Sequence, residues 1–174
     1  MNRDGVNRIE QQDIQTFIHN YFEENKPSFQ WKVEQSTPQK LVNVLVSFKK
    51  DIPADIQLQD VYGTFNQSGV LQYEDSICFF DSFTADVHEE NYLKTFSFDN
   101  QEGIEEGLVE AICRQLILTF SQGTHSLDEF LKDNKEQKFQ LVWNDRNLDS
   151  TIGTLKLSNR YSYKRLMIVD EQKE

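Results

Sequence analysis

The spacing of the apolar side chains changes at Pro27, and this change restricts the chain to folds that combine helices with strands. Before Pro27, apolar residues recur every three or four positions, which predicts a helix from about Ile9 to Glu24. After Pro27, apolar and polar residues alternate in the stretches SFQWKVEQS and LVNVLVSF. This alternation is typical of strands that are buried on one side. The turn sequence STPQK between the two stretches predicts a β-hairpin.

Further strands are predicted in the middle and at the end of the chain. The stretches VYGTF and VLQYEDSICFF flank the polar turn NQSG, so they predict a second hairpin. The stretches NYLKTFSF and FQLVW each predict one more strand. The segment from Asn144 to Asn159 shows no clear period and is expected to be irregular, and YSYKRLMIV after it predicts a last strand.

A second main helix is predicted from Ile104 to Phe120, where aliphatic side chains form a stripe at helical spacing. Asp99 or Asn100 is expected to cap its start, because both side chains accept hydrogen bonds from unpaired backbone N–H groups. The stretch SQGTH is expected to interrupt the helix. A capping box, Ser126 with Glu129 three residues later, then predicts a short additional helix.

These elements fit one domain, since 174 residues suffice for a single core of ordinary size. We expect an α+β fold over residues 9–169, with residues 1–8 and 170–174 as loose termini. The sheet is expected to be twisted, mainly antiparallel and built from about five to seven strands. Both main helices, the N-terminal one and the long one in the C-terminal half, are expected to pack on one face of it.

The charge of the chain argues against nucleic acid as its partner. The formal net charge is −11, and nucleic-acid binding draws much of its affinity from basic side chains that neutralise phosphates. The charge is uneven, however. Residues 1–145 carry a balance of −13, whereas Arg146 to Val169 carries +4. This basic segment keeps weak nucleic-acid binding open as an alternative.

Composition and motifs favour a cytoplasmic protein without a cofactor. The two cysteines lie far apart in apolar stretches, which indicates reduced, buried side chains. The N-terminus lacks a signal-peptide type of apolar run, and no stretch approaches the roughly 20 apolar residues that span a bilayer. The sequence contains no GxSxG elbow, no phosphate-binding GxxxxGK loop and no HExxH zinc motif. No known class of enzyme is indicated.

Four stretches carry a resemblance to a known family: LQYEDSICFF, GIEEGLVEAICRQLILTF, LDEFL and FQLVW. In their order and rhythm they resemble an uncharacterised family of Gram-positive bacterial proteins, catalogued as a domain of unknown function (number three thousand and thirteen). The resemblance extends from about Ile14 to Asp145 and leaves out residues 1–8 and the basic end. It implies a compact bacterial cytosolic domain and supplies no catalytic residues.

Glu74 and Asp75 are the residues that most suggest chemistry, because they stand side by side in an otherwise apolar strand. Neighbouring side chains on a flat strand point to opposite faces, so these carboxylates share a substrate only at a bulge. Burial of a lone carboxylate is costly, which favours an acidic kink or a strand break here. In the alternative, Glu74, Asp75 and Asp81 would together hold a divalent metal ion.

The second candidate site is the stretch NRYSYKRLMIV, in which basic and aromatic side chains alternate. Arginine and aromatic side chains together stack on bases or anchor a protein partner. The structural alternative is an edge strand whose basic residues discourage aggregation. The candidate binding residues are Arg160, Tyr161, Tyr163, Lys164 and Arg165.

The function that these observations favour is a non-catalytic protein-binding or adaptor module. The absence of catalytic motifs supports it, as does the second helix, which is apolar on more than one side near its end. Its partner is expected to be another protein or a second copy of the chain. The alternatives are a metal-dependent enzyme that uses the acidic cluster and a weak nucleic-acid binder that uses the basic stretch.

Overall fold

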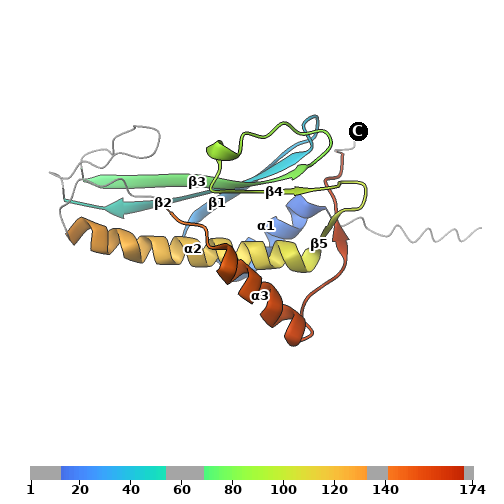
Figure 1. The fold of residues 1–174 in the computed structure, drawn as a ribbon. Helices are drawn as coiled ribbons and strands as arrows, with labels where there is room; N and C mark the ends of the chain where they lie inside the picture. Colours follow the sequence, from blue (N-terminus) through green and yellow to red (C-terminus); the bar gives the residue numbers. More distant parts are fainter. Residues whose placement is uncertain (1–12, 54–68, 133–140, 171–174) are drawn as a thin grey trace, which may run out of the picture.

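The computed structural model describes residues 13–53, 69–132 and 141–170 and shows a sheet with helices along one of its faces (Figure 1). The strands of this sheet are β1 (Gln30–Ser36), β2 (Leu41–Asp51), β3 (Val70–Asp81) and β4 (Lys94–Phe98). The helices are α1 (Ile14–Asn25), α2 (Glu106–Lys132) and α3 (Asp145–Leu157), with a 3-10 turn, η1 (Glu89–Asn91). Two short strands, β5 (Ile104–Glu105) and β6 (Arg165–Leu166), pair separately.

The predicted α+β fold is confirmed. The sheet has the order β1-β2-β3-β4, and its first three strands are antiparallel. β4 lies parallel to β3, so the sheet is mixed, and a parallel pair requires a crossover connection. Residues 82–93 form this connection on the face of the sheet opposite α2 (Figure 1). None of the helices in the described residues is long and apolar enough to cross a membrane.

α1 follows from its local sequence. The Asp13 side chain accepts a hydrogen bond from the Gln15 N–H at 3.3 Å and so caps the first turn. Lys26 ends the helix in a left-handed conformation, φ 42°, directly before Pro27. The predicted helix is therefore correct in its described part, and residues 9–12 of the prediction lie outside the described residues.

The core lies between the sheet and the helices α1 and α2. At its centre the ring of Phe120, on α2, is 5.0 Å from Phe29, 5.9 Å from Phe48 and 6.4 Å from Tyr73 between ring centroids. Ile14, at the start of α1, is fully buried at the other end of the same core. The two predicted helices thus pack on one face of the sheet, as expected.

α2 differs from its prediction at both ends. It begins at Glu106, because Asp99 instead closes a turn in which its side chain accepts from the Gln101 N–H at 2.9 Å. It also runs without a break through the stretch SQGTH and through the supposed capping box. The physical reason is burial, since Leu127 is fully buried two helical turns beyond Phe120 and holds this part of the helix on the core.

The C-terminal part also differs from its prediction. The segment expected to be irregular is α3, which Asn144 caps by accepting from the Asn147 N–H at 3.1 Å. Leu148 and Leu155, seven residues apart, are buried and attach α3 to α2. The strand predicted at FQLVW is absent from residues 141–143, and its first two residues lie outside the described ones. Of the predicted last strand, only β6 forms.

The second predicted hairpin is only partly described. Its VYGTF strand lies outside the described residues. Its other strand, β3, pairs along its length with β2, from Asp51 opposite Val70 to Leu41 opposite Phe80. Of the predicted loose termini, residues 1–8 and 170–174, all but Asp170 lie outside the described residues.

Candidate functional site

The acidic pair in β3 does not kink the strand. Ser47 lies opposite Glu74 and Val46 lies opposite Asp75, in a register that continues unchanged on both sides of the pair. The expectation of a bulge or a strand break at Glu74 and Asp75 is therefore wrong. Asp75 points to the helix-covered face, between Tyr73 and Ile77, and is only partly exposed.

Hydrogen bonds explain why the strand tolerates Asp75. The Tyr73 hydroxyl donates to Asp75 Oδ2 at 3.1 Å, and the Ser76 N–H donates to Oδ1 at 2.8 Å. Burial nevertheless dominates and raises the pKa of the Asp75 carboxyl above its ordinary value, although these bonds oppose the shift. The Asp75 carboxylate therefore has hydrogen-bond partners in the regular strand, but burial of its charge reduces stability.

We expect Asp75→Asn to stabilise the protein at neutral pH by about 0.5–1 kcal/mol. The raised pKa means that the folded protein prefers the protonated carboxyl, so ionisation reduces stability as pH rises through the raised pKa. The amide of the variant accepts from the Ser76 N–H and donates to the Tyr73 hydroxyl without this cost. Urea unfolding at pH 7 and at pH 3 measures the difference, which should vanish at the lower pH. A variant less stable than wild type at pH 7 would contradict this explanation.

The three carboxylates of the metal alternative are not brought together. Glu74 is exposed on the other face of the sheet, where the Gln72 side-chain amide donates to it at 2.8 Å. Asp81 shares the face of Asp75 but lies six residues away, roughly 20 Å along a strand. Within residues 13–53, 69–132 and 141–170, no group of three or more His, Cys, Asp or Glu side chains could hold a metal ion.

Asp81 instead organises one end of the sheet. It is the last residue of β3 and only 5% exposed. The Thr84 hydroxyl donates to its Oδ2 at 2.8 Å, and the Asn100 N–H donates to its Oδ1 at 3.1 Å. Burial acts to raise the pKa of Asp81, but these bonds, together with the charge of Lys40, outweigh burial and lower the pKa. Asp81 is therefore a carboxylate that stays ionised and joins two loops.

Asn100 extends this connection to the C-terminal segment. Its side-chain amide donates to the Ile168 carbonyl at 3.0 Å, and its Oδ1 accepts from the Ile168 N–H at 2.7 Å. Two further backbone bonds hold the same end of the sheet, from the Asp81 N–H to the Lys40 carbonyl and from the Ser82 N–H to the Phe98 carbonyl. The three segments that meet here are thus fixed relative to one another.

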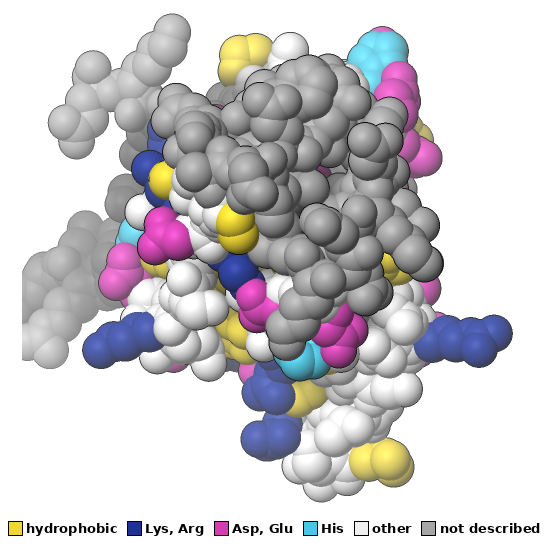
Figure 2. Space-filling view, turned by 90° about the vertical axis from the view of Figure 1, so that its left-hand side faces the viewer, with side chains coloured by type: hydrophobic (Ala, Val, Ile, Leu, Met, Phe, Trp, Pro, Cys, Tyr) yellow, Lys and Arg dark blue, Asp and Glu magenta, His cyan; other side chains and the backbone are white. Residues whose placement is uncertain are grey.

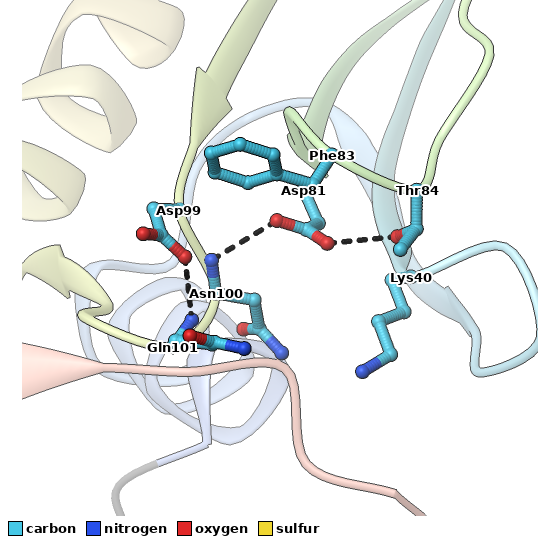
Figure 3. A pocket seen from close by; sticks show the side chains of 7 residues that line it. All are labelled: Lys40, Asp81, Phe83, Thr84, Asp99, Asn100 and Gln101. Carbon is cyan, nitrogen blue, oxygen red and sulfur yellow. Dashed lines mark hydrogen bonds between the residues drawn. The ribbon is translucent and has the colours of Figure 1, made fainter.

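A groove of about 420 Å³ opens at this end of the sheet (Figure 3). Figure 3 shows Lys40 on one side, the turn from Asp99 to Gln101 on the other, and Asp81 between them. The residues that line it are Lys40, Asp81, Phe83, Thr84, Asp99, Asn100 and Gln101. They come from the β1–β2 turn, the end of β3 with the loop after it, and the turn after β4.

The groove combines an apolar rim with charges of both signs. Phe83 is 79% exposed. A phenyl ring on the surface does not contribute the free energy that its burial would provide. Lys40 contributes an ammonium group, Asp99 a carboxylate and Gln101 an amide. Asp81 at its base is already occupied by hydrogen bonds. The groups available to a partner are therefore the Phe83 ring, the Lys40 ammonium, the Asp99 carboxylate and the Gln101 amide.

Three residues of this groove were named from the sequence, each in a different role: Asp81 as a possible metal ligand, and Asp99 or Asn100 as a helix cap. The signal that could have pointed to the groove is Phe83, a lone aromatic residue in the polar stretch DSFTAD. The pairing of three separate segments at this end could not be foreseen, because the β1–β2 turn and the turn after β4 are far apart in the sequence.

The basic candidate segment lies against the N-terminus of α2. The carbonyls of Lys164 and Ser162 accept from the N–H groups of Glu106 and Gly107, both at 2.8 Å. These are N–H groups that the first turn of a helix leaves unpaired. The segment therefore caps α2 with its backbone, and β6 follows directly.

Tyr161 is a packing residue in this arrangement. Its ring lies so close to Gly107 that a Cβ there would come within 2.6 Å of it, and the Lys156 ammonium sits 4.8 Å from the ring centroid. Its hydroxyl donates to Glu105 Oε1 at 3.4 Å. Burial, followed by the negative charge of Glu105, raises the pKa of Tyr161 to about 12. Its side chain is thus committed to the fold.

The other candidate residues of the segment differ in how far they take part in contacts within the fold. Arg165 donates to the Gly103 carbonyl at 3.3 Å, and the Tyr163 ring lies 4.9 Å from that of Tyr161. Arg160 and Lys164 are exposed. Figure 2, which views the molecule from the end where α2 terminates, shows Lys and Arg side chains interspersed with acidic and uncharged ones.

Comparisons with known proteins indicate a family and a fold. A family model described as "Protein of unknown function (DUF3013)" matches residues 9–165. The chain is similar in structure to a conserved protein of unknown function from Enterococcus faecalis, with a TM-score of 0.75 and 15% sequence identity. The match covers 92% of this chain and 98% of that protein. Comparison with curated proteins gives no match.

Proposed function

We propose that the chain, which belongs to the DUF3013 family of unknown function, is a cytoplasmic, non-catalytic protein-binding module. The groove would be its binding site. The observation that supports this function is the exposed ring of Phe83 on the rim of a polar groove. Exposed aromatic side chains beside polar groups are typical of residues that anchor a protein partner. A segment of the partner protein would occupy the groove.

The groups of the groove favour binding over catalysis. A general base must accept a proton near neutral pH, whereas Asp81 is held ionised by the bonds that lower its pKa. Burial raises the pKa of the Cys78 thiol to about 11 and raises that of Cys113 as well. A thiol with a raised pKa is a poor nucleophile. Neither cysteine lines the groove, and both thiols are buried in the fold.

The chemistry of the lining defines the partner segment. An apolar side chain would cover the Phe83 ring, since burial of such a contact contributes roughly 25 cal/mol per Å². A carbonyl or carboxylate oxygen of the segment would accept from Lys40 Nζ. An N–H or ammonium group would donate to the Asp99 carboxylate. A short extended peptide supplies all three groups within one or two residues.

Site-specific photocrosslinking in the cell tests the proposal. The photoreactive residue p-benzoylphenylalanine replaces Phe83 in one variant and Val142 in the control, whose side chain is exposed to the same extent, 78% against 79%. We expect a discrete crosslinked protein at position 83 and none at position 142. Equal crosslinking at the two positions, or none at position 83, would count against a protein-binding groove.

A further inference from the structure

Within the part of the chain that the structure describes, β1 has a hydrogen-bonded neighbouring strand on one side only. It stands at the end of the strand order and pairs with β2. The Gln15 side-chain amide donates to the Val33 carbonyl at 3.3 Å, which places this carbonyl on the side away from β2. Backbone direction alternates along a strand, so the N–H and C=O groups of Trp31 and Gln35 point the same way. These three residues form an edge to which another strand can add.

The register of β2 also indicates that the backbone groups of Val33 point away from β2. The Lys40 carbonyl accepts from the Asp81 N–H at 3.0 Å and so points toward β3. Alternation then directs the backbone of Val44 toward β3 as well. Val44 lies opposite Val33, which makes this a pair without mutual hydrogen bonds. The backbone of Val33 is therefore directed outward.

The side chains beside this edge are complementary to a second copy of themselves. Lys32 and Glu34 lie on the exposed face, with 72% and 48% of their side chains accessible, and form an ion pair of 2.6 Å with each other. If two β1 strands run antiparallel with Val33 opposite Val33, Lys32 of each copy lies opposite Glu34 of the other. These two positions form a pair without mutual hydrogen bonds, in which cross-strand side chains come closest.

The other face of β1 supplies apolar contact. Trp31 and Val33 pack there against the core and remain half-buried. Trp31 is held in place by Phe22, 5.4 Å away between ring centroids, and by the edge of His19 at 5.1 Å. Addition of a second β1 strand would cover both side chains. The apolar and the charged face of β1 thus favour the same register.

We propose that two copies of this chain pair through their β1 strands, antiparallel and centred on Val33, so that one sheet continues through both. The interface differs from the groove, whose lining includes no residue of β1, so the dimer does not depend on the proposed function. The Val33 carbonyl exchanges its bond with Gln15 for one with the facing strand. The charged pairs set the register and the identity of the partner.

Charge exchange between positions 32 and 34 tests the proposal in the full-length protein. Lys32→Glu places two carboxylates opposite each other twice in the dimer, and Glu34→Lys does the same with two ammonium groups. Each variant should dissociate about tenfold to a hundredfold more readily than wild type at low salt. An equimolar mixture of the two variants restores both opposite-charge pairs, so it should form a mixed dimer. The double variant should form a dimer by itself.

Sedimentation velocity measures dissociation, and native mass spectrometry of differently tagged variants identifies the mixed dimer. Circular dichroism verifies that the variants are folded, which the exposure of both side chains predicts. Two results would overturn the proposal. One is a wild-type protein that stays monomeric up to millimolar concentration. The other is a dimer whose dissociation is the same in both single variants and in wild type.

Discussion

Phe120→Ala is expected to lower the free energy of unfolding by about 3–5 kcal/mol, the largest effect of any substitution considered. Phe120 is 2% exposed and contacts Phe29, Phe48 and Tyr73. It therefore joins α2 to the sheet and to the residue before β1. Removal of the ring leaves a cavity that three aromatic side chains cannot fill without leaving their positions. Urea unfolding followed by circular dichroism measures the loss.

Phe83→Ala is the matched control, because it makes the same chemical change at a ring that is 79% exposed. We expect its free energy of unfolding to stay within about 0.5 kcal/mol of wild type. The pair separates a core role from a surface role. A loss at position 83 as large as that at position 120 would show that Phe83 serves the fold, and it would remove the main argument for a binding groove.

Gly103→Ala is expected to destabilise the protein by about 2–4 kcal/mol. Gly103 has a φ of +82°, a conformation that is strained for a residue with a side chain. A Cβ at this position would also lie 2.7 Å from the Leu166 carbonyl oxygen, which is backbone and cannot rotate away. The substitution therefore pushes β5 and β6 apart. Thermal or urea unfolding measures the effect.

Gly153→Ala is the control for this prediction. Gly153 lies within α3, and apart from its chain neighbours and the backbone of its own helix no atom lies within 4 Å of the position its Cβ would take. Alanine favours a helix over glycine by about 1 kcal/mol, so this variant should be more stable than wild type. Opposite signs at the two glycines are the expected outcome. A neutral result at Gly103 would contradict the described contact between β5 and β6.

The elements with a clear local period could be predicted from the sequence. α1 and the β1–β2 hairpin follow from apolar spacing alone, since each buries one face against the core. The termination of α1 beside Pro27 follows from the geometry of proline. The α+β class and the packing of the two main helices on one face of the sheet could then be predicted from these elements.

The elements that were predicted wrongly are those whose structure depends on tertiary contacts. The stretch SQGTH is a poor helix sequence, but α2 continues through it because Leu127 is buried against the body of the protein. α3 has an Asn144 cap and only two fully covered leucines, so its period is too weak to recognise without the neighbouring α2. Local propensity is a weak guide where a few buried side chains hold a segment.

The acidic residues of β3 show why single-residue reasoning reached the wrong conclusion. The cost of a buried carboxylate predicted a bulge at Asp75, but the sequence does not reveal that Tyr73 and Ser76 can satisfy the group in a regular strand. The candidate groove was missed for a related reason. Its lining joins three turns that only the folded sheet brings together.

The most direct test of the protein-binding function is the affinity of wild type and Phe83→Ala for the protein that crosslinks at position 83. Calorimetry with the purified pair gives both dissociation constants. Since a central aromatic anchor typically contributes more than 1 kcal/mol, the variant should bind about tenfold more weakly or worse, with its fold intact. Equal dissociation constants for the two proteins would contradict the account.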